Sequence, residues 1–109
     1  MALVPMTAPV PIVLGAPVVR VGAYPTLQIL YAAANLRALT AGPFTIEIRQ
    51  AGGGAPLIKA FTFNAPGAQV SEANELDFTI PNDMGWRVDV VSLGIGASDC
   101  LVTLWGNVL

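Results

Sequence analysis

Few residues of this chain could carry chemistry, and their types do not combine into a known reaction. The chain has no histidine, which removes Ser–His and Cys–His nucleophile pairs and the commonest metal ligand. Cys100 is the only cysteine, so we interpret it as a small apolar residue rather than a disulfide partner or a zinc ligand. Gly52-Gly53-Gly54 lacks the Lys and Ser or Thr of a phosphate-binding loop and predicts a tight turn. We therefore expect a protein that is not an enzyme and has no cofactor and no metal.

The carboxylates Glu72, Glu75 and Asp77 are close in sequence and need a separate test. A glycosidase requires two carboxyl groups roughly 5 to 10 Å apart in a cleft. Glu75 and Asp77 would share one face of a strand, but that face alternates with apolar residues and is the one expected to meet water. We interpret both as solvated surface residues. A buried carboxylate pair in a deep cleft would be needed to favour an enzyme.

Alternation of apolar and polar residues predicts the elements that hold these side chains. It predicts strands at residues 18–24, 44–49, 57–64, 75–80, 86–90 and 101–107. The strands at 44–49 and 57–64 are expected to form a hairpin, and residues 94–98 are expected to form a loop. Residues 26–39 are ambiguous because three consecutive alanines favour a helix. The β-branched and aromatic residues of that stretch favour a strand that ends in a turn near Asn35.

About eight short strands at regular spacing indicate an all-β fold, specifically an antiparallel β-sandwich of jelly-roll type over residues 18–109. Residues 1–17 differ from this pattern because Pro5, Pro9, Pro11 and Pro17 interrupt them. Each proline fixes φ and pushes the preceding residue into an extended conformation. We predict an extended N-terminal arm that is apolar and therefore lies on a surface.

Composition indicates that part of the surface is covered by another protein. Hydrophobic residues make up 54% of the chain and charged residues 11%, against about 25% charged in an ordinary domain. The early prolines exclude a membrane helix, and the start has no basic residue of a signal peptide, so we expect no membrane partner and synthesis in the cytoplasm. The five cations are scattered and the net charge is −2, which argues against nucleic acid.

The aromatic residues and the last predicted strand give the candidate contact surfaces. Trp86 and Trp105 are in phase with apolar neighbours, which favours packing in a core or an interface. Tyr24 and Tyr31 are less constrained and are candidate glycan contacts. The strand at 101–107 is apolar on both faces, which predicts a subunit interface. Its candidate residues are Val102, Leu104 and Trp105.

Several segments occur in the order found in known virion proteins. They are Thr26–Leu30, Gly42 with Phe44–Arg49, Asp77–Pro81, Gly85–Val90, Gly94–Gly96 and Val102–Gly106. With these segments the chain resembles small bacteriophage virion proteins with jelly-roll domains, such as capsid decoration or cement proteins and head fibres. The resemblance implies a homotrimer on the particle surface and brings no catalytic residues with it.

Two functions follow as hypotheses. The first is a capsid decoration or cement protein that trimerises and anchors on the virion surface, with the major capsid protein or another virion protein as partner. Its arm would anchor through apolar side chains that a proline-fixed segment can dock at low entropic cost. These are Val4, Met6, Val10, Ile12, Val13 and Leu14. The alternative is a carbohydrate- or receptor-binding module of a fibre or adhesin that uses Tyr24 or Tyr31.

Overall fold

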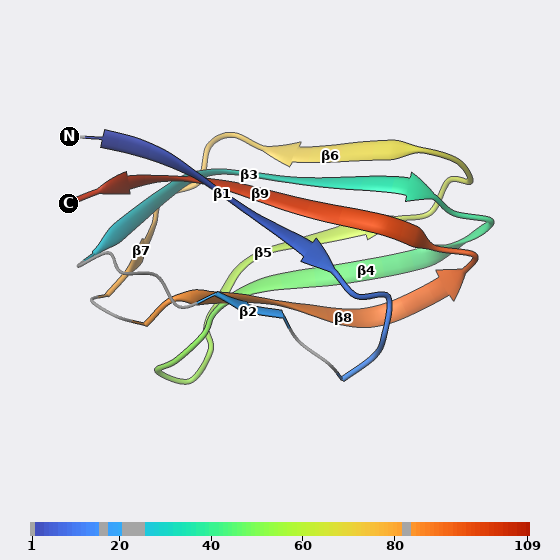
Figure 1. Cartoon of the computed structure of the whole chain (residues 1–109), viewed down its shortest axis with the longest axis horizontal. Coiled ribbons are helices and arrows are strands. Elements are labelled where there is room, and N and C mark those ends of the chain that lie inside the picture. Colours follow the sequence, from blue (N-terminus) through green and yellow to red (C-terminus); the bar gives the residue numbers. More distant parts are fainter. Residues whose placement is uncertain (1, 16–17, 21–25, 82–83) are drawn as a thin grey trace.

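The computed structural model describes residues 2–15, 18–20, 26–81 and 84–109. These residues form two antiparallel sheets packed face to face, which confirms the predicted β-sandwich (Figure 1). The strands are Ala2–Val10 (β1), Val18–Arg20 (β2), Leu27–Ala38 (β3), Ala41–Gln50 (β4), Leu57–Phe63 (β5), Gln69–Ala73 (β6), Phe78–Ile80 (β7), Trp86–Ile95 (β8) and Ser98–Val108 (β9). No helix long and apolar enough to cross a membrane occurs in the described ranges.

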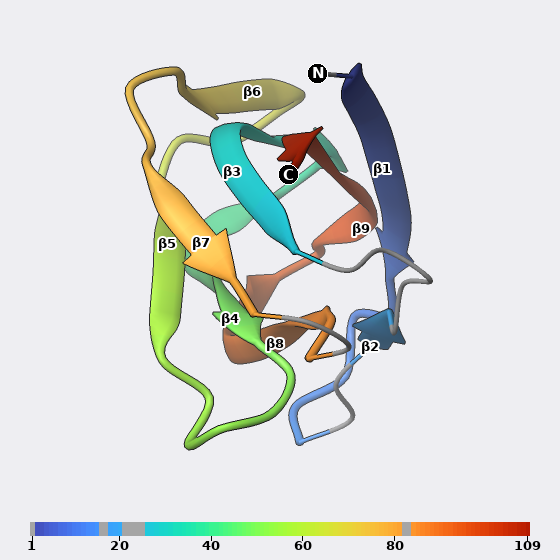
Figure 2. The same ribbon diagram turned by 90° about the vertical axis from the view of Figure 1, so that its left-hand side faces the viewer.

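The two sheets have different strand orders. Sheet A runs β1-β9-β3-β6, with β7 pairing the other end of β3, and sheet B runs β2-β8-β4-β5. Figure 2 shows the layers from the end where both termini lie, with sheet A above sheet B. Alternate residues of each strand point between the sheets, as the two-residue period of a strand requires. Ile29 of β3, Phe44 of β4 and Leu104 of β9 are fully buried in the resulting core.

The N-terminal segment is part of sheet A, which corrects the prediction of an arm outside the sandwich. β1 pairs antiparallel with β9 from Ala2 to Val10. Pro5 and Pro9 do not prevent this, because β1 is an edge strand and the two prolines have the same parity. N–H groups of successive residues point to opposite sides of a strand, so the even-numbered residues keep theirs for β9. Both faces of β1 carry apolar residues, so the sequence pattern does not show which face points into the core.

β3 continues straight through the residue where a turn was predicted. The expectation of a strand over residues 26–39 is correct, but the turn near Asn35 is wrong. Asn35 pairs with Val70 of β6 and with Leu101 of β9. Ala32, Ala34 and Leu36 alternate as buried residues, so packing against sheet B outweighs the helix propensity of the alanines. The chain turns after Ala38 instead.

The hairpin of β4 and β5 is confirmed, with its turn at Gly53 and Gly54, which have φ angles of 63° and 84°. The predicted strand at 75–80 is shorter and covers only β7, while β6 was not predicted because its five residues are mostly polar. The predicted loop at 94–98 is reduced to Gly96 and Ala97 between β8 and β9.

Candidate functional site

A β-bulge in β3 places two consecutive side chains on the outer face of sheet A. Ile29 pairs with Gly106 and Tyr31 pairs with Trp105, so Leu30 is the extra residue between them. Ile29 and Ala32 are fully buried, whereas Leu30 and Tyr31 are both partly exposed. A bulge of this kind redirects a side chain that regular alternation would have turned inward. The result is an apolar and aromatic pair beside Trp105.

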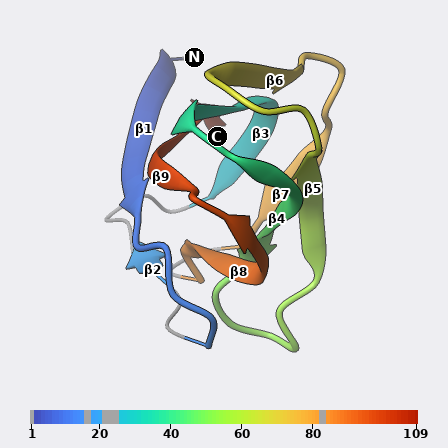
Figure 3. The same ribbon diagram turned by 90° about the vertical axis from the view of Figure 1, so that its right-hand side faces the viewer.

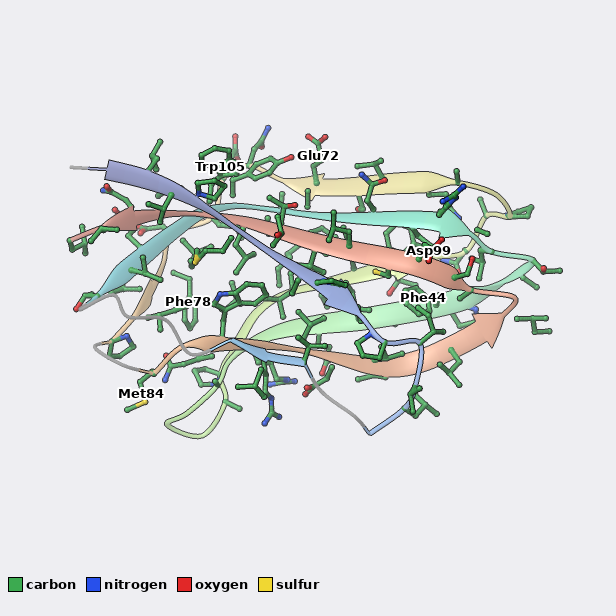
Figure 4. All side chains as sticks on the ribbon, in the orientation of Figure 1. Phe44, Glu72, Phe78, Met84, Asp99 and Trp105 are labelled. Carbon is green, nitrogen blue, oxygen red and sulfur yellow. The ribbon has the colours of Figure 1, made fainter. Side chains whose placement is uncertain are left out.

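Leu30, Tyr31 and Trp105 line a shallow pocket of about 370 Å³ on this outer face. Leu3 of β1 and Asn74, just after β6, complete its lining. The pocket is therefore built by β1, β3, β9 and the residue that follows β6. Pro5, Trp105 and Tyr31 are aligned in the register of β1, β9 and β3, so the pocket crosses these three adjacent strands. Trp105 is 38% exposed, unlike Trp86, which is 2% exposed in the core. Figure 4 shows Trp105 and Glu72 projecting from the same face of the sandwich.

Glu72 lies beside Tyr31, one of the residues that line this pocket. The pKa of Tyr31 is raised above its ordinary value, first by partial burial and then by the adjacent Glu72 carboxylate. A negative charge beside the hydroxyl favours the neutral, protonated form of the Tyr31 phenol. Glu72 itself is exposed and makes no ion pair with the described Lys and Arg side chains. A carboxylate with free acceptor capacity thus borders an aromatic surface.

A polar row lies next to the pocket toward the chain termini. Gln28 donates a hydrogen bond of 2.8 Å from Nε2 to Oδ1 of Asp77. Asn107 donates from Nδ2 to Oε1 of Gln28 at 3.4 Å, and the two residues are paired in the sheet register. Asn107 is buried while Gln28 is partly exposed. The pocket therefore has amide and carboxylate groups on two of its sides.

The residues predicted for a subunit interface are separated by the structure. Val102 and Leu104 are fully buried against sheet B, so the prediction that they meet another subunit is wrong. β9 lies between β1 and β3, and its inward face therefore belongs to the core of its own chain. Trp105 points outward, because it is one residue out of phase with Leu104 along β9.

The predicted anchor residues are also divided. Val10 is buried, and Val4, Met6 and Ile12 are partly buried and pack against the core. Because β1 is paired with β9, these side chains do not belong to a free arm, and their contact with a particle stays a prediction. Val13 and Leu14, in the connection that follows β1, are 53% and 51% exposed and remain candidates.

The other sequence-based candidates have no chemical setting. Tyr24 lies outside the described residues. Glu75 and Asp77 are exposed, and no group of three His, Cys, Asp or Glu side chains that could hold a metal ion occurs within the described part of the chain. Cys100 is buried, and burial raises the pKa of its thiol to about 12. A thiol of this kind stays protonated and unreactive near neutral pH.

Sheet B has a different outer surface, part charged and part apolar. Arg49 pairs with Glu47 at 2.9 Å and Arg87 with Asp89 at 3.1 Å. The two pairs lie side by side, since Glu47 opposes Asp89 and Arg49 opposes Arg87 in the register. This arrangement mixes both signs of charge and provides no cationic stripe.

The edge of sheet B beside β2 is apolar. β2 pairs only with Trp86–Val88, so β8 has no strand partner on that side from Asp89 to Ile95 among the described residues. Figures 1 and 3 show residues 11–15, which follow β1, on this side of sheet B. The exposed apolar side chains in this region, together named the apolar edge, are Val13, Leu14, Val19, Val91 and Ile95.

Sequence reasoning identified Tyr31 but not the pocket around it. The missed residues are Leu3, Leu30, Glu72 and Asn74. One signal was present, because Leu30-Tyr31 gives two consecutive large residues where a strand should alternate. Leu3 and Asn74 come from other elements and could be placed only by the pairing of strands.

No protein-family model matches the chain, and no curated protein matches it by sequence. Among solved structures, it is similar to a chain from Bacillus endospore appendages, described as a novel family of disulfide-linked pili, with 15% identity and a TM-score of 0.40. That match covers 99% of this chain and 86% of the other. A chain of infectious bursal disease virus, strain Gx, has 8% identity and a TM-score of 0.38 over 95% of this chain and 30% of its own length. At these TM-scores neither likeness bears on function.

Proposed function

We propose that the protein is a structural subunit of a virion surface, acting as a capsid decoration or cement protein without catalytic activity. It would be made in the host cytoplasm and would assemble as a homotrimer that docks on the major capsid protein or another virion protein. The observation that carries this proposal is the apolar edge of sheet B. The choice of a virion as the assembly rests on the resemblance of the sequence to small bacteriophage virion proteins.

The apolar edge is suited to contact with protein rather than water. Residues 11–19 contain no charged side chain, and Val91 and Ile95 are 47% and 64% exposed. Exposed apolar side chains that gather in one region of a surface are characteristic of interaction surfaces. The unpaired side of β8 adds backbone N–H and C=O groups that another chain could bond. Contact along this edge would bury both kinds of group at once.

The apolar edge also provides exposed contact residues in place of the predicted ones that are buried. We propose that Val91 and Ile95 of β8 contact neighbouring copies, while Val13 and Leu14 in the preceding connection face the particle. This division keeps the anchor near the N-terminus but moves it to the two residues that are exposed. It also moves the trimer contact from the centre of sheet A to the edge of sheet B.

The experiment is the native mass of the purified protein, measured by light scattering behind a sizing column over a series of concentrations. We expect a trimer for the natural sequence and a monomer for Val91→Asp, because an unpaired carboxylate in an apolar interface is costly to desolvate. Leu57→Asp is the matched control, since Leu57 is 44% exposed on β5, away from the apolar edge. A natural chain that stays monomeric at every concentration refutes the trimer, and loss of the trimer in the control refutes its proposed location.

A further inference from the structure

We infer that the shallow pocket on the outer face of sheet A binds one neutral sugar ring of a glycan. This inference concerns a different face from the apolar edge and does not depend on the trimer. It rests on the shape that the β3 bulge creates, on the aromatic surface of Tyr31 and Trp105, and on the polar groups that border it.

The shape of the pocket fits a flat ligand with an apolar face. Its volume of about 370 Å³ lies near the lower limit of small-molecule sites, which are roughly 300–1,000 Å³. Tyr31 and Trp105 are cross-strand partners on one face of a sheet. The faces of aromatic rings carry partial negative charge, and the C–H groups of a pyranose carry partial positive charge. A sugar stacked here would also contact Leu3 and Leu30 with the same apolar face.

The edges of the pocket provide partners for sugar hydroxyl groups. Asn74 lines the pocket and offers an amide donor and acceptor, and Glu72 offers carboxylate oxygens. The Tyr31 hydroxyl lies near Glu72, and its oxygen has lone pairs that can accept a hydrogen bond from a ligand. Planar amide and carboxylate groups can each bond two neighbouring hydroxyls. The polar groups on the β6 side of the pocket would therefore orient the sugar ring, and the aromatic side chains of β3 and β9 would stack against it.

Other classes of ligand fit these groups less well. No cation lines the pocket, and Glu72 repels a phosphate or other anion. A second copy of this chain on the pocket would bring the Glu72 carboxylate, which has no ion pair among the described residues, into an interface, and charged residues are depleted in the cores of protein interfaces. A quaternary ammonium is usually enclosed by several aromatic rings, whereas this pocket is shallow and has two.

The two tryptophans make a direct test feasible by NMR of the full chain. Each gives one indole N–H signal, with Trp105 in the pocket and Trp86 in the core as an internal control. The probes are four neutral oligosaccharides built of glucose in α and β linkage, of mannose and of N-acetylglucosamine, each titrated at millimolar concentration. We expect one of them to shift the Trp105 signal with saturation and to leave the Trp86 signal in place.

Variants then locate the binding. We expect affinity to fall about tenfold or more in Trp105→Ala and in Tyr31→Ala, and to stay unchanged in Leu57→Ala on sheet B. Glu72→Gln should weaken a sugar only a few-fold, because an amide still bonds hydroxyls. Choline chloride is the competing probe: saturable choline binding that is lost in Glu72→Gln would overturn the inference in favour of a cationic ligand.

The remaining outcomes are also decisive. If none of the four oligosaccharides shifts the Trp105 signal, the pocket does not bind neutral sugars of these types and the inference fails. If the Trp105 signal moves with protein concentration alone, another copy covers the pocket and the inference is likewise wrong. The first result leaves the native mass expected from the apolar edge unchanged. In the second, association through the pocket would persist in Val91→Asp, so failure of this inference is distinguishable from failure of the proposed function.

Discussion

Leu104→Ala is the substitution that separates a core position of β9 from an interface position. Leu104 is fully buried, on the face of β9 that packs against sheet B. Truncation to alanine removes apolar contacts and leaves a cavity, which costs about 2–5 kcal/mol when the surroundings cannot relax. A domain of this size has a total stability of roughly 5–15 kcal/mol. We therefore expect the variant to fold with a markedly lower free energy of unfolding.

Leu101→Ala is the matched control on the same strand. Leu101 is 41% exposed on the opposite face, and its loss should cost less than about 1 kcal/mol. Both free energies are measured by urea unfolding followed through tryptophan fluorescence, with the slope of the transition checked for constancy. At about 4–8 °C per kcal/mol, Leu104→Ala should also lower Tm by at least roughly 8 °C.

The alternative makes the opposite prediction. If Leu104 lay at a subunit interface, its substitution would dissociate the assembly at low protein concentration and leave the unfolding of the separated chain little changed. Equal free energies of unfolding for the Leu104→Ala and Leu101→Ala variants would refute the assignment of Leu104 to the core. A change in native mass without a change in stability would restore the interface.

Three further outcomes follow from the structure. Cys100, with a pKa of about 12, should not react with Ellman's reagent at pH 8 until the protein is unfolded; rapid reaction of the native protein would show that the thiol is accessible. Tyr31 should ionise above its ordinary pKa of 10.0 in an ultraviolet titration, and Glu72→Gln should lower that pKa. Because the pKa of Tyr31 is higher in the folded than in the unfolded chain, the protonated phenol stabilises the fold below pH 10, and this contribution is lost as pH rises further. Gly94→Ala should lower the free energy of unfolding by about 1–3 kcal/mol, because φ is +60° and a Cβ would lie 2.7 Å from a backbone carbonyl oxygen. Gly54→Ala should lower it less, because Gly54 also has a positive φ but faces open space. Equal losses measured by urea unfolding would show that the close contact at Gly94 is relieved.

The fold was predictable wherever one face of a strand is polar. The β4 strand alternates Phe44, Ile46 and Ile48 with polar residues. The predicted strand at 44–49 lies within it, and its hairpin with β5 and the glycine turn between them are confirmed. Alternation fails as a guide where both faces are apolar. In β1 and β9 it left open which face belonged to the core, so Val102 and Leu104 were placed at an interface although they are buried.

The candidate site was less predictable because its residues converge from distant parts of the chain. Leu3, Tyr31, Asn74 and Trp105 become neighbours only when β1, β9, β3 and β6 pair in that order. No local pattern specifies this order, since the contacts join segments separated by tens of residues. The Leu30-Tyr31 dipeptide was the one local sign, as two large residues in succession are a feature of a bulge.

Bulges also explain how an unusually apolar chain distributes its surface. Val91 is the extra residue of β8, because Val90 pairs with Ile46 and Ser92 with Thr45. The bulges at Leu30 and Val91 each add an outward apolar side chain, one on sheet A and one on sheet B. The proposed sugar site and the proposed assembly edge therefore lie on different layers and need not compete. It follows that Trp105→Ala should leave the native mass unchanged and Val91→Asp should leave sugar binding unchanged, and a variant that abolished both while remaining folded would show that the two surfaces are one.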